Sequence, residues 1–131
     1  MSAAAVVVAQ PEVGRDLRGV LTTLLKLDHI MGGLVVAPDG LLIAADLPHE
    51  IQAEPLAALA ATLGRELEMR GPRLRRGTFP VAQFASVSGA VFIGSTPVGY
   101  IVLLGEPRAD WDAIRAALRR AVGTVYRAWA G

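Results

Sequence analysis

Three stretches of the chain place apolar side chains three or four residues apart, which is the spacing of one face of a helix. They cover residues 12–27, residues 55–70 and a last stretch after Asp110, a residue suited to the N-cap of a helix. The pattern therefore predicts three helices. The apolar positions are Leu17, Val20, Leu21, Leu24 and Leu27 in the first, Leu56, Leu59, Leu63 and Leu67 in the second, and Trp111, Ile114, Leu118, Val122, Val125 and Trp129 in the third.

Five shorter apolar runs lie between these helices and read as strands. Residues 34–37 and 41–44 flank Pro38-Asp39-Gly40, a strong turn signal, and so form a hairpin. Met31-Gly32-Gly33 is expected to separate the first helix from this hairpin. Three more strands are expected over residues 81–87, 90–93 and 98–104, and the continuous apolar runs in the last two indicate strands covered on both faces. The predicted element order is α-β-β-α-β-β-β-α.

Two segments within this order resemble the Roadblock/dynein light chain family. Residues 33–45, Gly-Leu-Val-Val-Ala-Pro-Asp-Gly-Leu-Leu-Ile-Ala-Ala, look like the family's first hairpin. Residues 54–63, Glu-Pro-Leu-Ala-Ala-Leu-Ala-Ala-Thr-Leu, look like the start of its Ala- and Leu-rich central helix. The matching stretch runs from about Leu17 to Val122, which is nearly the whole chain.

The resemblance implies an α+β fold, in which a five-stranded antiparallel sheet lies between helix layers, as in profilin-like domains. The first and last helices would cover one face of the sheet and the middle helix the other. Family members pair as two-fold dimers through the middle helix and the third strand. They bind small Ras-like GTPases or act as adaptors in larger assemblies, and some bacterial members stimulate GTP hydrolysis without supplying a catalytic residue.

The residues themselves also favour a dimer. Ala57, Ala61 and Gly64 lie three or four apart on the middle helix, and a row of small side chains lets two helices approach closely. We therefore expect them at the dimer interface, although Ala is also simply a good helix former. Gln83, Phe84 and Ala85 lie at the centre of the third strand, which would be an open edge that invites pairing with a second copy.

Composition limits the range of functions. The chain has 131 residues, which fits a short tail (residues 1–11) and one domain (residues 12–131). A net charge of +1 argues against nucleic-acid binding, which needs a concentrated basic face. The apolar fraction of 53% suggests that some apolar surface is hidden in an oligomer. The apolar run Ala3–Ala9 is too short to span a membrane and lacks the basic start of a signal peptide. We expect a cytoplasmic, bacterial protein without membrane insertion.

Candidate catalytic and cofactor chemistry is sparse. The chain has no Cys, and its two histidines, His29 and His49, stand apart from other potential metal ligands, so we expect no metal site. The glycines of residues 94–99 have the spacing of a P-loop, but Tyr100 stands where the Lys would be, which indicates a turn. Glu66 and Glu68 point in different directions on a helix. Ser86, Ser88 and Ser95 lack a nucleophile-elbow sequence, and we expect a non-enzyme without a cofactor.

One cluster of basic residues is a candidate partner-binding site. Arg70, Arg73, Arg75 and Arg76 form the densest charge run, which could steer an acidic partner or simply be a solvated loop. The leading hypothesis is a dimeric regulator or scaffold of a small Ras-like GTPase. Two alternatives stay open: a small-molecule sensor of the profilin- or PAS-like type, and an adaptor that works without any GTPase.

Overall fold

The computed structural model describes residues 11–71 and 80–130 and confirms the predicted order of elements. Helix α1 ends three residues earlier than expected, and the chain then continues through tight turns to Leu27. Asp110 caps the last helix as predicted, because its carboxylate accepts a hydrogen bond from the Ala113 amide at 3.1 Å. The elements are α1 (Pro11–Leu24), β1 (Ile30–Val36), β2 (Leu42–Asp46), α2 (Ala53–Arg70), β3 (Val81–Ser86), β4 (Gly89–Thr96), β5 (Gly99–Gly105) and α3 (Trp111–Ala130).

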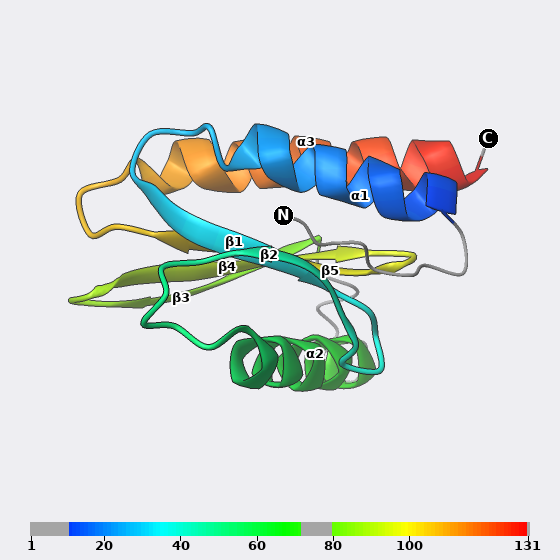
Figure 1. Ribbon diagram of the computed structural model, residues 1–131, viewed down its shortest axis with the longest axis horizontal. Helices are drawn as coiled ribbons and strands as arrows, with labels where there is room; N and C mark the ends of the chain where they lie inside the picture. The colour runs from blue at the N-terminus through cyan, green and yellow to red at the C-terminus, as the bar shows by residue number, and fades with distance from the viewer. Residues whose placement is uncertain (1–10, 72–79, 131) are drawn as a thin grey trace.

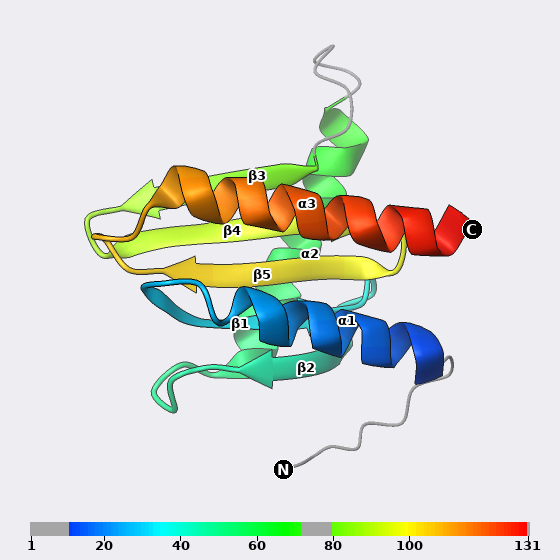
Figure 2. The same cartoon turned by 90° about the horizontal axis from the view of Figure 1, so that it is seen from above.

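The five strands form one antiparallel sheet in the order β2-β1-β5-β4-β3. Helices α1 and α3 cover one face and α2 covers the other, as the resemblance implied (Figure 1). Seen from above, α1 and α3 run in opposite directions along the strands, whereas α2 crosses beneath them (Figure 2). The expected open edge is confirmed, because β3 lies at one end of the sheet.

The predicted start of the first strand is wrong. Gly32 and Gly33 lie inside β1 instead of separating it from α1. A Cβ atom on Gly32 would lie 2.5 Å from the Asp46 carbonyl oxygen of β2, and one on Gly33 would lie 2.6 Å from the Val102 carbonyl oxygen of β5. These glycines therefore allow the backbones of neighbouring strands to approach closely, and they do not interrupt the strand.

Both predicted hairpin turns are present. In the β1–β2 turn, the Gly40 amide donates to the Ala37 carbonyl at 2.9 Å, and Gly40 has a φ of 93°, which glycine adopts without strain. Residues 94–99, which have P-loop spacing in the sequence, form the end of β4 and the turn into β5. The Thr96 hydroxyl donates to the Gly99 carbonyl at 2.8 Å and closes that turn.

The sheet separates two hydrophobic cores. On one face, Leu17, Leu21 and Leu24 of α1 pack with α3 over the sheet, and on the other face the core lies under α2. Phe92 and Leu103 of the central strands point to the first core, and Ile93 and Val102 point to the second. This arrangement confirms that the continuous apolar runs of β4 and β5 are buried on both faces.

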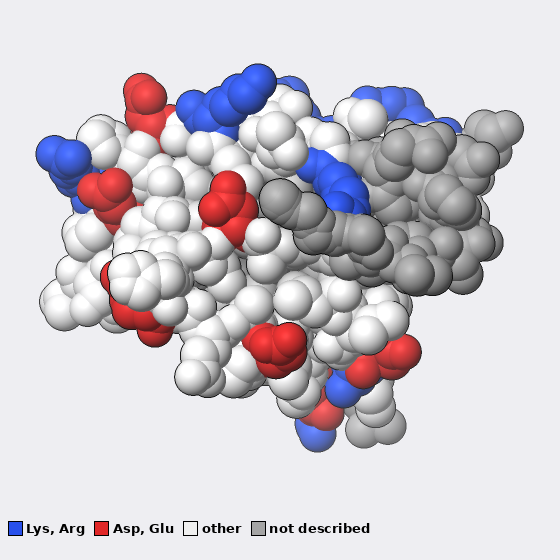
Figure 3. Space-filling model, viewed as in Figure 1, with Lys and Arg blue, Asp and Glu red and all other residues white. Residues whose placement is uncertain are grey.

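Both acidic and basic side chains appear among the described residues on the face shown in Figure 3. Acidic and basic side chains lie scattered among uncharged atoms there, in keeping with the near-zero net charge. Among the described helices, none is both long enough and apolar enough to cross a lipid bilayer.

Candidate interaction site

The small residues of α2 face the sheet. Ala57 and Ala61 are buried against Tyr100 and its neighbours, and a Cβ atom on Gly64 would lie 2.5 Å from the Tyr100 ring. The expectation that these three residues meet a partner helix is therefore corrected: their small size lets α2 approach its own sheet. A second helix cannot reach them without displacing α2.

The leucines of α2 remain on the accessible side. Leu56, Leu63 and Leu67 are half-buried at the flank of the helix, and Leu59 is 56% exposed. The spacing of three or four residues places these four side chains along one side of α2, and we call them the leucine face. Helix α2 is thus apolar on two sides, as the sequence suggested, and the small-residue side is the one that is fully buried against the sheet.

Strand β3 places an exposed aromatic side chain on the same face of the sheet as α2. Val91, which packs in the same cluster as Leu56 and Leu63, is the cross-strand partner of Phe84, and Phe84 is 43% exposed. Ala85 is exposed as well, whereas the Gln83 side chain accepts a hydrogen bond from Arg115 of α3 at 2.6 Å. Of the three predicted β3 residues, Phe84 therefore points to the face of the sheet that α2 covers, and Gln83 points to the opposite face.

A polar cluster fastens the C-terminal half of α2 to the sheet. The Glu68 carboxylate accepts hydrogen bonds from the Ser95 hydroxyl at 2.5 Å and from the Tyr100 hydroxyl at 2.8 Å. Burial raises the pKa of Tyr100, and the hydrogen bond to the Glu68 carboxylate raises it further. Ser95 is buried and its proton is held by the carboxylate, so the cluster stabilises the packing of α2 rather than offering an exposed nucleophile.

Sequence reasoning missed this cluster, although two signals pointed to it. Glu68 follows Gly64 by four residues and so lies on the sheet-facing side of α2. Ser95 and Tyr100 are cross-strand neighbours in the β4–β5 hairpin. The expectation that Glu66 and Glu68 point in different directions is confirmed, because Glu66 instead pairs with Arg70 at the surface, at 2.5 Å.

The basic cluster is described only in part. Arg70 is exposed, and its hydrogen bond to Glu66 raises the pKa of the guanidinium. Arg73, Arg75 and Arg76 lie outside the described residues. Arg70 belongs to the last turn of α2, where a cation also interacts favourably with the helix dipole.

The remaining candidate residues are spread over the surface. His29 lies near Glu106, with 3.9 Å between Nδ1 and Oε1, and His49 lies on the exposed connection after β2. Ser86 is the last residue of β3 and Ser88 lies in the β3–β4 turn, and the Ser86 hydroxyl accepts a hydrogen bond from the Ser88 amide at 3.1 Å. Within residues 11–71 and 80–130, no group of three or more metal-ligating side chains comes together.

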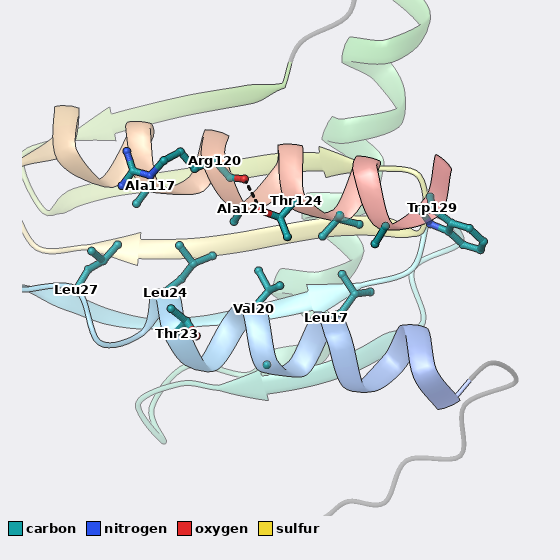
Figure 4. A pocket seen from close by; sticks show the side chains of 13 residues that line it. Leu17, Val20, Thr23, Leu24, Leu27, Ala117, Arg120, Ala121, Thr124 and Trp129 are labelled. Carbon is teal, nitrogen blue, oxygen red and sulfur yellow. Dashed lines mark hydrogen bonds between the residues drawn. The ribbon is translucent and has the colours of Figure 1, made fainter. Parts of the chain in front are cut away.

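A groove lies between α1 and α3, on the face of the sheet opposite α2 (Figure 4). Its volume is about 830 Å³, and its walls are mostly aliphatic. The polar residues of the lining are Thr23, Arg120 and Thr124, and the Thr124 hydroxyl already donates to the Arg120 carbonyl at 3.1 Å. A metabolite site would need several polar groups that converge on a ligand, which this lining does not supply.

Sequence comparison finds distant relatives of undetermined function. The chain is 28% identical over 106 residues to the uncharacterised protein MJ0310 of Methanocaldococcus jannaschii, a match that covers 81% of this chain and 93% of the relative. It is 29% identical to MJ1340 of the same organism, with the same coverage. No family model matches the sequence.

The structural neighbours are Roadblock/LC7 domain proteins. Myxococcus xanthus MglB superimposes with a TM-score of 0.81 at 16% identity, covering 95% of this chain and 94% of its own. A Roadblock/LC7 domain from Streptomyces avermitilis gives 0.71 at 19% identity, covering 86% and 97%. An MglB in a tetrameric arrangement gives 0.73 at 15% identity, covering 96% of both chains. The chain therefore has the Roadblock/LC7 fold.

Proposed function

We propose that this chain is a non-catalytic, dimeric, cytoplasmic protein-binding module that regulates or scaffolds a small Ras-like GTPase. The observation that carries the proposal is that two apolar features, the leucine face and the exposed Phe84 on the edge strand β3, lie on the same face of the sheet. A helix that is apolar on two sides tends to be buried on both. Its own sheet buries the first side, and a second copy would bury the other.

The proposed dimer joins two copies of the same surface. Around a two-fold axis the leucine face of one copy would meet that of its partner, because such an interface is self-complementary. The edge of β3 would pair with the partner's β3 and satisfy backbone groups that face water in the isolated chain. Of the interface residues expected from the sequence, Phe84 and Ala85 stay in this proposal, and Leu56, Leu59, Leu63 and Leu67 replace those that face the sheet.

Two arguments support a GTPase as the partner. The first hairpin and the central helix resemble a family whose members bind small Ras-like GTPases, and the solved neighbours include MglB proteins. The C-terminal end of α2 also carries Arg70, with Arg73, Arg75 and Arg76 following it in the sequence. A basic cluster of this kind would speed association with an acidic partner surface.

The proposal is tested by capturing partners from lysate of the source cells. The tagged chain is the bait, in parallel with GDP and with a non-hydrolysable GTP analogue, and bound proteins are identified by mass spectrometry. We expect a Ras-like GTPase that is enriched with the GTP analogue. The Leu59→Arg variant serves as a second bait that lacks the dimer, and Leu41→Arg, at an exposed position on the β1–β2 turn, is its matched control.

Two outcomes would contradict the proposal. Failure to enrich a GTPase with either nucleotide would argue against GTPase regulation. Capture of the same partner with both nucleotides would favour an adaptor that is independent of the nucleotide state.

A further inference from the structure

The groove between α1 and α3 has apolar walls that stay open to solvent. Trp129, near the end of α3, lines it and is 43% exposed. Gly19 of α1 also lines it, and a Cβ atom there would meet nothing within 4 Å. Figure 4 shows Val20 and Leu24 of α1 pointing toward the gap that Thr124 borders from α3. The described chain thus leaves an aliphatic channel that another segment could fill.

The chain contains a segment of matching chemistry that immediately precedes α1 in the sequence. Residues 1–10, Met-Ser-Ala-Ala-Ala-Val-Val-Val-Ala-Gln, have no charged side chain, and residues 3–9 are all Ala or Val. Small aliphatic side chains suit a narrow space between two helices. The segment joins α1 at Pro11, and α1 begins at the same end of the molecule at which α3 and its Trp129 end (Figures 1 and 2).

The length of the segment also fits. Val20 follows Pro11 by nine positions, which corresponds to about 13 Å along α1. Four extended residues cover about 13 Å, so a chain that turns back at Pro11 brings Val7 level with Val20 and Thr124. The ten residues together could reach roughly 33 Å, which is enough to follow the channel to Leu27. Because the segment is tethered, its effective concentration at the channel is in the millimolar range.

We propose that residues 1–10 bind in the groove between α1 and α3 of their own chain and cover Trp129. A second copy or a partner helix would lack the tether, and neither begins at the mouth of the channel. The inference does not depend on the proposed GTPase or on the dimer, since the groove and the leucine face lie on opposite faces of the sheet (Figure 1).

Engineered cysteines test the proposal in the chain of 131 residues, because its sequence has none. The double variant Val7→Cys/Thr124→Cys is oxidised at low protein concentration and analysed on a non-reducing gel. Its matched control is Val7→Cys/Thr62→Cys. Thr62 of α2 and Thr124 of α3 are both exposed, and each hydroxyl donates to the carbonyl four residues earlier. The two positions therefore differ chiefly in the face of the sheet on which they lie.

The expected result is a disulfide at monomer mass in the Thr124 pair, at least fivefold more abundant than in the Thr62 pair. Equal yields in the two pairs would overturn the proposal. Cross-linking only at dimer mass would also overturn it, because the groove would then hold the segment of a second copy.

Fluorescence gives an independent readout of burial. In a Trp111→Phe background Trp129 is the single tryptophan. Replacing Val6, Val7 and Val8 together by Asp would put charges into the apolar channel and release the segment. We expect a red shift of Trp129 emission and stronger quenching by acrylamide. Unchanged emission and quenching would show that the segment does not cover Trp129.

Discussion

At the scale of single residues, two helical glycines have opposite surroundings. Gly64 of α2 lies against the Tyr100 ring, where a Cβ atom would approach to 2.5 Å, whereas a Cβ atom on Gly19 of α1 would be in open space. Glycine costs about 1 kcal/mol relative to alanine in either helix. At Gly64 this cost is offset by the close packing of α2 on the sheet, and at Gly19 the isolated domain gains nothing in return.

The two glycines therefore respond differently to the same substitution. Gly64→Ala is expected to lower the free energy of unfolding by about 1–3 kcal/mol, because the added methyl group forces Tyr100 or α2 to move. Gly19→Ala is expected to raise it by up to about 1 kcal/mol. Urea denaturation of both variants measures the two changes in the free energy of unfolding. Equal effects at the two positions would show that α2 does not approach the sheet as described.

The raised pKa of Tyr100 makes the free energy of unfolding depend on pH in the alkaline range. Its pKa is raised by burial and by the Glu68 carboxylate, above the ordinary value of about 10. Above pH 10 the unfolded chain releases this proton while the folded chain keeps it, so the free energy of unfolding falls as the pH rises. The stabilisation is fully present below about pH 10.

Urea denaturation between pH 8 and pH 11 checks this prediction, with Tyr100→Phe as the comparison. The variant is expected to be less stable at pH 8, because it loses the hydrogen bond to Glu68, and to lose less stability between pH 10 and pH 11. If the free energy of unfolding fell in parallel with pH for the two proteins, the pKa of Tyr100 would not be raised in the folded chain.

At the scale of elements, the sequence predicted the number, type and order of helices and strands. Hydrophobic periodicity and turn residues are local signals, and they are sufficient for the Asp-Gly hairpin and for the N-cap Asp110. The start of β1 was missed because Gly32 and Gly33 read locally as a break. Their actual role is to admit the backbones of β2 and β5, which are distant in sequence.

The orientation of α2 could not be predicted from its own residues. The helix has a small-residue side and a leucine side, and either could face a sheet by local criteria. Tyr100 determines which side of α2 faces the sheet, because its ring fills the space beside Gly64 and its hydroxyl reaches Glu68 on the same side of the helix. These partners lie more than thirty residues apart, so only the tertiary structure brings them together.

This orientation predicts a large loss of stability for an arginine at one position of α2 and almost none at another. Ala61→Arg places a charge in the second core and is expected to destabilise the fold by several kcal/mol or to prevent folding. Ala58→Arg, at an exposed position, is expected to change stability by less than about 0.5 kcal/mol. Circular dichroism during thermal unfolding distinguishes the two. A folded, stable Ala61→Arg protein would contradict the packing of α2.

At the scale of the whole molecule, the sheet separates two surfaces with different proposed roles. The α2 face, with the leucine face and β3, would join two copies, and the α1–α3 face would hold the N-terminal segment. The sequence predicted β3 as the open edge, and Phe84 remains a proposed interface residue. The sequence alone could not distinguish leucines that face solvent from leucines that face a core, because both kinds recur at the same helical spacing.

The central claim is that the leucine face forms a two-fold interface, and sedimentation equilibrium tests it most directly. The natural chain is expected to sediment at twice its monomer mass. Leu59→Arg is expected to weaken dimerisation by on the order of a hundredfold, because a two-fold interface contains the substituted residue twice. Leu41→Arg, which replaces a leucine that is 66% exposed on the β1–β2 turn, should leave the dimer intact. A monomeric natural chain, or a Leu59→Arg variant as dimeric as Leu41→Arg, would contradict the account.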